Sequence, residues 1–247
     1  MPKHLSQAPA SSQTPAGSPA PAATPAAGQA SQNPLLAAAQ KLFGGLKMNW
    51  PAVIIFALAA GLYTGIMGSI PALAPTSFHD ICVSYECWVI LAFIIAANCG
   101  KGWEAALKIF VFFLISQPLV YAIEVLTGNL QLDMAIYYYR TIWGPATLFT
   151  LPGGFVAHLI KRQDPLGAIV LGLGNAILAV MAINYAAQVL RTPPFHLLTV
   201  IVCVATIFVM TFAIQKTRKD RLICFATVAA ALGAVVAYAL VNHLMLF

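Results

Sequence analysis

Five polar side chains interrupt long apolar stretches of this chain and are the first candidates for chemistry. Three are neutral, namely Ser116, Gln117 and Asn175, and two are acidic, Glu86 and Glu124. A polar group inside a bilayer costs free energy unless it pairs or faces a cavity, so such residues often mark a ligand or ion path. These five are therefore the predicted substrate-binding residues.

Each of these residues also has a structural interpretation. Amide side chains such as those of Gln117 and Asn175 can hold helices together through hydrogen bonds worth about 1 kcal/mol. A carboxylate buried near the end of a span could bind a cation or relay a proton. Glu86 and Glu124 could equally reach interfacial water or pair with Arg140. The sequence leaves both alternatives open.

Prolines and glycines inside the apolar stretches predict irregular helices. Pro118 and Pro152 each remove a backbone N–H donor, and Gly153 and Gly154 directly follow the second proline. Broken helices near the middle of the membrane bind substrate in many transporters, although kinks are also ordinary in membrane bundles. Pro118, Pro152, Gly153 and Gly154 are the predicted hinge residues.

Motifs for known chemistry are missing from the sequence. It contains no HExxH and no GxxxxGK[ST] pattern. Ser69 and His158 fall at opposite ends of the predicted spans, which excludes a serine–histidine dyad. His79, Asp80 and Cys82 cluster outside, but no second ligand group at metal spacing accompanies them. No catalytic residue, metal site or cofactor is predicted, and an intramembrane enzyme is only a third hypothesis.

Composition places the elements that carry these residues in a membrane. Of 247 residues, 60% are hydrophobic and only 8% are charged, whereas soluble domains carry roughly a quarter charged residues. The thirteen Lys and Arg residues lie in short groups between apolar runs. Nucleic-acid binding would need them on one face, so the predicted partner is the lipid bilayer and not nucleic acid.

Seven apolar stretches are long enough to cross the hydrocarbon core, which needs about 20 helical residues for roughly 30 Å. The predicted fold is therefore an all-α, polytopic transmembrane helical bundle. The second stretch is the least regular, because Glu86 lies in its first turns. The predicted spans are 51–70, 82–99, 103–126, 141–160, 166–189, 196–215 and 222–245.

The basic residues predict the orientation of these spans. Cytoplasmic loops hold the excess of Lys and Arg, and seven spans place eleven of the thirteen basic residues on one side. Only Arg140 and Arg191 fall on the other side. The N-terminus is therefore predicted in the cytoplasm and the C-terminus outside. A bacterial inner membrane is the predicted location, since no eukaryotic targeting or retention signal occurs.

Three regions make up the predicted chain. Residues 1–34 are rich in Pro, Ala and Ser and predict a disordered cytoplasmic tail, because they cannot bury enough apolar surface to fold. Residues 35–49 predict a short helix lying on the inner leaflet. Residues 50–247 form the transmembrane domain.

Two local clusters keep alternative interpretations. Tyrosines 137–139 and Trp143 are typical of an aromatic belt at the outer interface, and they could also line a mouth for an apolar or cationic ligand. Cys82 and Cys87 are the only close cysteine pair. A helix would separate their α-carbons by about 8 Å, so a disulfide there requires a loop.

Small residues predict how the spans pack and suggest the competing functions. Gly61 and Gly65, like Ala230 and Ala234, recur at a spacing of four, which favours close helix contact or a homo-oligomer seam. The leading hypothesis is a small permease or channel-like transporter of an unidentified solute, based on the predicted hinge and the buried amides. The alternative is a non-catalytic membrane scaffold or partner subunit of a larger complex.

Overall fold

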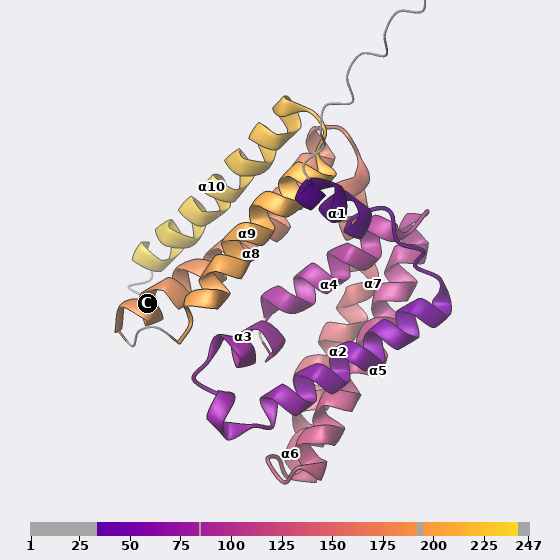
Figure 1. Ribbon diagram of the computed structural model, residues 1–247, viewed down its shortest axis with the longest axis vertical. Helices are drawn as coiled ribbons and strands as arrows, with labels where there is room; N and C mark the ends of the chain where they lie inside the picture. The colour runs from indigo at the N-terminus through magenta and orange to yellow at the C-terminus, as the bar shows by residue number, and fades with distance from the viewer. Residues whose placement is uncertain (1–33, 84, 192–194, 242–247) are drawn as a thin grey trace, which may run out of the picture. The chain divides into compact units, whose positions relative to one another are not determined.

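Every regular element in the described part of the chain is a helix (Figure 1). The computed structural model describes residues 34–83, 85–191 and 195–241, so nearly all of the predicted tail at 1–34 lies outside the described residues. The side chain of Cys82 also lies outside them, which leaves a bridge to Cys87 untested. The elements are α1 (Pro34–Leu42), α2 (Trp50–Gly68), η1 (Pro71–Leu73), α3 (Ser77–Val83), α4 (Tyr85–Asn98), α5 (Gly102–Leu126), α6 (Leu132–Tyr138), η2 (Tyr139–Trp143), α7 (Gly144–Ala157), η3 (His158–Lys161), α8 (Pro165–Arg191), α9 (Leu197–Ile214) and α10 (Arg218–Val241).

Five of the described helices are long and apolar enough to cross a membrane, namely α2, α5, α8, α9 and α10. They coincide with the predicted spans one, three, five, six and seven. The second predicted span is shorter than expected, because α4 has 14 residues and follows the separate helix α3. In the region of the fourth predicted span, α6, η2, α7 and η3 follow one another directly over residues 132–161, and none of them is among the five long apolar helices.

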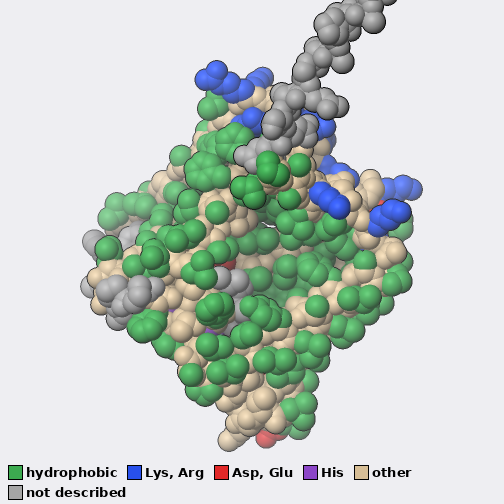
Figure 2. All heavy atoms as spheres, viewed as in Figure 1, with side chains coloured by type: hydrophobic (Ala, Val, Ile, Leu, Met, Phe, Trp, Pro, Cys, Tyr) green, Lys and Arg blue, Asp and Glu red, His purple; other side chains and the backbone are tan. Residues whose placement is uncertain are grey.

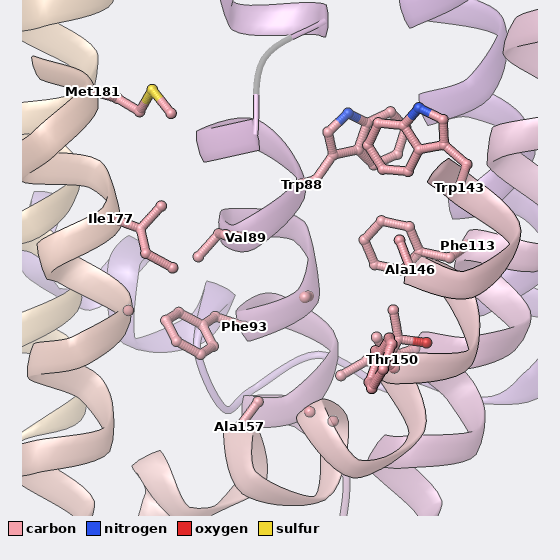
Figure 3. Close-up of a pocket in the computed structure, with 16 residues that line it drawn as sticks. Trp88, Val89, Phe93, Phe113, Trp143, Ala146, Thr150, Ala157, Ile177 and Met181 are labelled. Atoms are coloured by element: carbon pink, nitrogen blue, oxygen red, sulfur yellow. The ribbon is translucent and has the colours of Figure 1, made fainter. Parts of the chain in front are cut away.

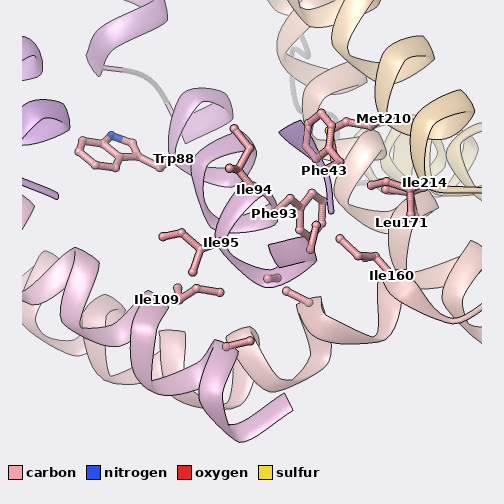
Figure 4. Close-up of a cluster of buried hydrophobic side chains, with 14 of the residues drawn as sticks. Phe43, Trp88, Phe93, Ile94, Ile95, Ile109, Ile160, Leu171, Met210 and Ile214 are labelled. Carbon is pink, nitrogen blue, oxygen red and sulfur yellow. The ribbon is translucent and has the colours of Figure 1, made fainter. Parts of the chain in front are cut away.

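The helices form two groups joined by α4. In one group α2 and α7 pack on α5, and in the other α9 and α10 pack on α8 (Figure 1). Helix α4 contacts α5, α7 and α8. Its buried residues Phe93, Ile94 and Ile95 meet Ile109 of α5 and Leu171 of α8 in one apolar core (Figure 4). Helix α4 therefore connects the two groups through this core, and α3, which contacts both α2 and α9, connects them as well.

Glycines permit the closest helix contacts, as their spacing predicts. A methyl group on Gly61 would lie 2.9 Å from the Ser116 carbonyl oxygen of α5. On Gly172 it would lie 2.6 Å from Cβ of Thr227 on α10. These separations are too short for a side chain, so both contacts require glycine. In contrast, Gly233 in the second half of α10 has no described atom within 4 Å of that position.

The loops that carry most of the basic residues meet at one end of the bundle, here called the basic end (Figure 2). Lys161 donates to the Cys99 carbonyl oxygen at 2.6 Å, and the Lys216 amide donates to Oε1 of Gln163 at 2.9 Å. Asn98 donates to the carbonyl oxygen of Leu42 at 2.7 Å and accepts from the Leu46 amide at 2.7 Å. Helix α1 ends at Leu42, well short of the predicted boundary at residue 49. The charge pattern therefore matches the arrangement of the loops.

The opposite end of the bundle carries a different set of polar contacts. Ser69 accepts a hydrogen bond from Thr127 at 3.0 Å, and its carbonyl oxygen accepts one from Asn129 at 2.8 Å. His158 lies in η3, beside the basic loop that carries Lys161. Ser69 and His158 thus lie at opposite ends, as the sequence predicts.

Candidate functional site

A pocket of about 290 Å³ lies between α2, α4, α5 and the α6–η2 segment, and it is here called the polar pocket. Two of the predicted site residues, Gln117 and Glu124, line it together with Thr64. The amide nitrogen of Gln117 is buried and has no hydrogen-bond partner among the described residues. The remaining lining residues are aromatic or aliphatic, namely Trp88, Val120, Tyr121, Leu130, Tyr138 and Trp143.

A larger cavity of about 660 Å³, the apolar chamber, lies between α4, α5, α7 and α8 (Figure 3). Its walls are almost entirely hydrocarbon, and Thr150 contributes the single hydroxyl among the lining side chains. Phe149 of α7 lines the chamber yet is 74% exposed, and Ile177 of α8 is 43% exposed. In a membrane these positions face lipid, so the chamber is accessible from the side.

Trp88 and Trp143 line both cavities. Figure 3 shows their indoles together at one end of the chamber, above Phe113. The Trp88 ring is held by Phe112 and Phe113, with ring centroids 6.0 and 5.6 Å away. The two tryptophans therefore form the boundary between the polar pocket and the apolar chamber.

One face of α5 lines both cavities. Gln117, Tyr121 and Glu124 recur at helical spacing and share one face, and Ile109 and Phe113 continue that face into the chamber. Residues 109 and 124 are about 22 Å apart at 1.5 Å per residue. Helix α5 thus runs beside both cavities, and Glu124 lies towards the end opposite the basic loops.

A wide helical turn positions Trp143. Residues 139–143 form the π-helical turn η2, which connects α6 directly to α7. Such turns are rare inside helices and frequently occur at functional sites. A methyl group on Gly144 would lie 2.9 Å from the Tyr139 carbonyl oxygen, so a residue without a side chain is needed where the turn closes.

Helix α7 continues through Pro152 to Ala157, so the helix is not broken there, and a hinge at Pro152 stays a prediction. Helix α5 likewise continues through Pro118. The two glycines after Pro152 differ in their surroundings. A methyl group on Gly154 would lie 2.8 Å from the Ala106 α-carbon, whereas no described atom lies within 4 Å of that position on Gly153, which lines the chamber. The irregular turn of this segment is η2.

The remaining predicted site residues do not line the polar pocket. Ser116 is buried against Gly61 of α2. Asn175 is buried between α8, α9 and α10, where its amide donates to Oγ1 of Thr211 at 3.0 Å. Glu86 is only 3% exposed and lines neither cavity. Only Gln117 and Glu124 of the five therefore share one site.

Two arrangements could not be read from the sequence. Trp88 joins the site only because α4 packs against α5. At the end of the bundle opposite the basic loops, Asp80 lies against His196, which is 116 residues further along the chain. The described residues contain no group of three or more His, Cys, Asp or Glu side chains placed to hold a metal ion.

Comparison with protein-family models, curated proteins and solved structures finds no match to this chain. The fold alone therefore defines its class. By the length and hydropathy of five helices, the chain is a multi-pass membrane protein of the all-α class. What the two cavities bind must be argued from their chemistry.

Proposed function

We propose that the protein is a small permease for solutes with an apolar part. The observation that carries this proposal is the series of two cavities that meet at Trp88 and Trp143. A polar opening beside an apolar chamber suits a molecule that has one polar end. The side opening near Phe149 supplies a second route, towards lipid.

The proposed topology has seven spans, with α4 and the α6–η3 segment as the second and fourth. Its N-terminus lies in the cytoplasm and its C-terminus outside, in a bacterial inner membrane. The basic end at Lys161 and Lys216 then faces the cytoplasm, in keeping with the positive-inside rule. The polar pocket opens towards the outer side in this orientation.

The proposed transport step uses irregular segments of the fourth span. Gly153 has free space at the chamber wall, and η2 can regain ordinary helical geometry only by moving Trp143. Pro118 and Pro152 leave carbonyl oxygens without a partner N–H inside α5 and α7, which lowers the cost of bending. Movement of Trp143 would connect the two cavities.

Uptake into proteoliposomes tests the proposal. Tetraphenylphosphonium, 8-anilinonaphthalene-1-sulfonate and glucose serve as cationic, anionic and wholly polar solutes. We expect uptake of at least one amphipathic solute above empty liposomes, and a loss of about tenfold in Gln117→Ala and Trp143→Ala. Ser116→Ala is the matched control, since Ser116 neighbours Gln117 but faces α2. Uptake equal in all variants would overturn the assignment of the site.

A second candidate function is a partner subunit or homo-oligomer, and the exposure of α10 favours it. All described side chains from Gly233 to Val241 are exposed, and small residues such as Ala234 and Ala237 lie among them. Small residues on an uncovered helix suit contact with another helix. Light scattering after purification in mild detergent should then show a companion, whereas a lone monomer would contradict this function.

A further inference from the structure

We propose that the polar pocket selects an organic ammonium cation whose apolar body reaches the chamber past Trp88 and Trp143. This inference rests on the proposed permease function and names its substrate class. The chemistry follows from one acidic side chain, four aromatic side chains and one buried amide.

The charge of the polar pocket favours a cation. Glu124 is the single charged side chain that lines the polar pocket. Among the described residues no Lys, Arg or His lies within 4.0 Å of its carboxylate, so the sequence-based alternative of a pair with Arg140 is not formed. Arg140 instead lines a neighbouring groove with Pro118 and Leu132. A carboxylate at this depth is stabilised by a cation, and the ligand can supply it.

The walls of the polar pocket are rich in aromatic rings. Four of the nine lining residues are aromatic, namely Trp88, Tyr121, Tyr138 and Trp143. Aromatic rings attract cations through their negative faces, and cages of such rings recognise substituted ammonium groups. An inorganic cation would need several oxygen ligands, whereas this pocket offers one carboxylate. A hydrophobic, substituted ammonium group fits better.

The position of Gln117 favours a ligand that carries a hydrogen-bond acceptor. Its side chain is 2% exposed, and its amide nitrogen has no partner within the described ranges. It lies between Glu124 and Phe113 on the shared face of α5, where the polar pocket ends and the chamber begins. A ligand with an oxygen acceptor next to its ammonium group would satisfy this donor.

Volume and access agree with an amphipathic cation. The polar pocket of about 290 Å³ admits a small head group, and the chamber of about 660 Å³ admits a hydrocarbon body. Two sources carry this chemistry, namely a membrane lipid with an amine or choline head group and a dissolved amphipathic amine. Both would place the same charge beside Glu124.

A matched pair of ligands tests the selection of charge. Phenyltrimethylammonium and its uncharged isostere tert-butylbenzene are titrated into the full chain in dodecyl maltoside, with tryptophan fluorescence and calorimetry as readouts. We expect the cation to bind at least tenfold more tightly than the isostere. Equal affinities would overturn the inference.

Substitution of the acid makes the test specific. Glu124→Gln should weaken binding of the cation at least tenfold and leave binding of the isostere unchanged. Glu124→Asp should recover part of the lost affinity for the cation. Asp133→Asn is the matched control, because Asp133 is exposed and lines neither cavity. Cation affinity within twofold of the native protein in Glu124→Gln would also overturn the inference.

Mass spectrometry of copurified lipid distinguishes a membrane lipid from a dissolved amine as the ligand. Retained amine or choline lipid that phenyltrimethylammonium displaces supports a lipid ligand, and cation binding without retained lipid supports a dissolved one. Different results would contradict the proposed permease function and the ammonium inference. Glu124-dependent binding without uptake contradicts the permease alone, whereas Trp143-dependent uptake that ignores charge and Glu124→Gln contradicts the ammonium inference alone.

Discussion

Oδ2 of Asp80 lies 2.6 Å from Nδ1 of His196, and this contact joins α3 to the start of α9. The same carboxylate oxygen accepts a hydrogen bond from Oγ1 of Thr199 at 2.8 Å. Ser77 adds two bonds, since its hydroxyl donates to the Phe195 carbonyl oxygen and accepts from the Thr199 amide. One buried acid thus joins α3 to the first turn of α9, at the end of the bundle opposite the basic loops.

Replacement of Asp80 should loosen the end of the bundle opposite the basic loops. Asp80→Ala leaves Thr199 and His196 without a shared acceptor, and we expect a loss of about 1–3 kcal/mol of unfolding free energy. Thermal unfolding in detergent should then shift by about 2–4 °C for each kcal/mol. Asp133→Ala, at an exposed acid, should leave the midpoint unchanged. An unchanged midpoint in Asp80→Ala would contradict the anchoring role.

Asn175 should act in packing and not in binding. Its amide holds Thr211 of α9 and lies 3.6 Å from Sγ of Cys224 on α10, so Asn175→Ala should cost about 1 kcal/mol of stability. Affinity for phenyltrimethylammonium should stay within twofold. Asn184→Ala, at an exposed amide of the same helix, is the control for stability. A tenfold loss of affinity in Asn175→Ala would return this residue to the site.

Gly153 and Gly154 should respond oppositely to the same change. Gly154→Ala places a methyl group against the backbone of Ala106, and overpacking of this kind costs about 1–3 kcal/mol. Gly153→Ala adds a better helix former in open space and should raise the thermal midpoint slightly. If Gly153 is also the hinge, uptake should fall in that more stable variant. Equal losses of stability in both variants would contradict the difference between the surroundings of Gly153 and Gly154.

Asp164 should make the basic end sensitive to acid. The Arg162 guanidinium, bonded to its carboxylate, lowers the pKa of Asp164 below the ordinary aspartate value, and the Gly167 N–H acts in the same direction. A lowered pKa in the folded state stabilises the protein above the ordinary value of about 3.9, and this contribution is lost as the pH falls through the lowered pKa.

Melting curves of the native protein and Asp164→Asn test this sign. The native midpoint should exceed that of the variant at pH 6, and the difference should shrink steadily below pH about 4. Arg162→Gln should reduce the difference at pH 6, since it removes the main cause of the lowered pKa. If the difference between the native and Asp164→Asn midpoints were undiminished at pH 2, the lowered pKa of Asp164 would not be its cause.

Labelling of single cysteines should reveal the proposed orientation. In a background without native cysteines, Asn129→Cys should react with an impermeant maleimide in intact cells, because this residue lies at the end opposite the basic loops. Lys216→Cys should react only after the cells are opened. The reverse pattern would invert the topology, and labelling of both from outside would exclude an odd number of spans between them.

Hydropathy and charge were sufficient to predict most of the helices and the grouping of basic loops. The five long helices need about 20 apolar residues each, a property visible in any window of the sequence. The same count predicts the depth of Gln117 and Glu124 in the membrane. Burial alone could not separate Gln117 from its neighbour Ser116, because both are buried while successive helical residues point about 100° apart and only Gln117 lines the polar pocket.

Other features depend on contacts that no local pattern contains. Trp88 of α4 reaches the pocket because α4 packs against α5, and Asp80 meets His196 because α3 packs on α9. The proline at position 152 favoured a break, yet neighbouring helices can satisfy the freed backbone groups of a transmembrane proline. The π-helical turn that begins at Tyr139 contains no proline or glycine that would indicate its position in the sequence.

This turn has a consequence for insertions and deletions. A π-helical turn holds one residue more than an α-helical turn, so η2 sets α6 and α7 out of phase by about 100°. Removal of a single residue between Tyr139 and Trp143 would restore continuous phase without shortening either flanking helix. Trp143 would then rotate away from Trp88, and the partition between the two cavities would open permanently.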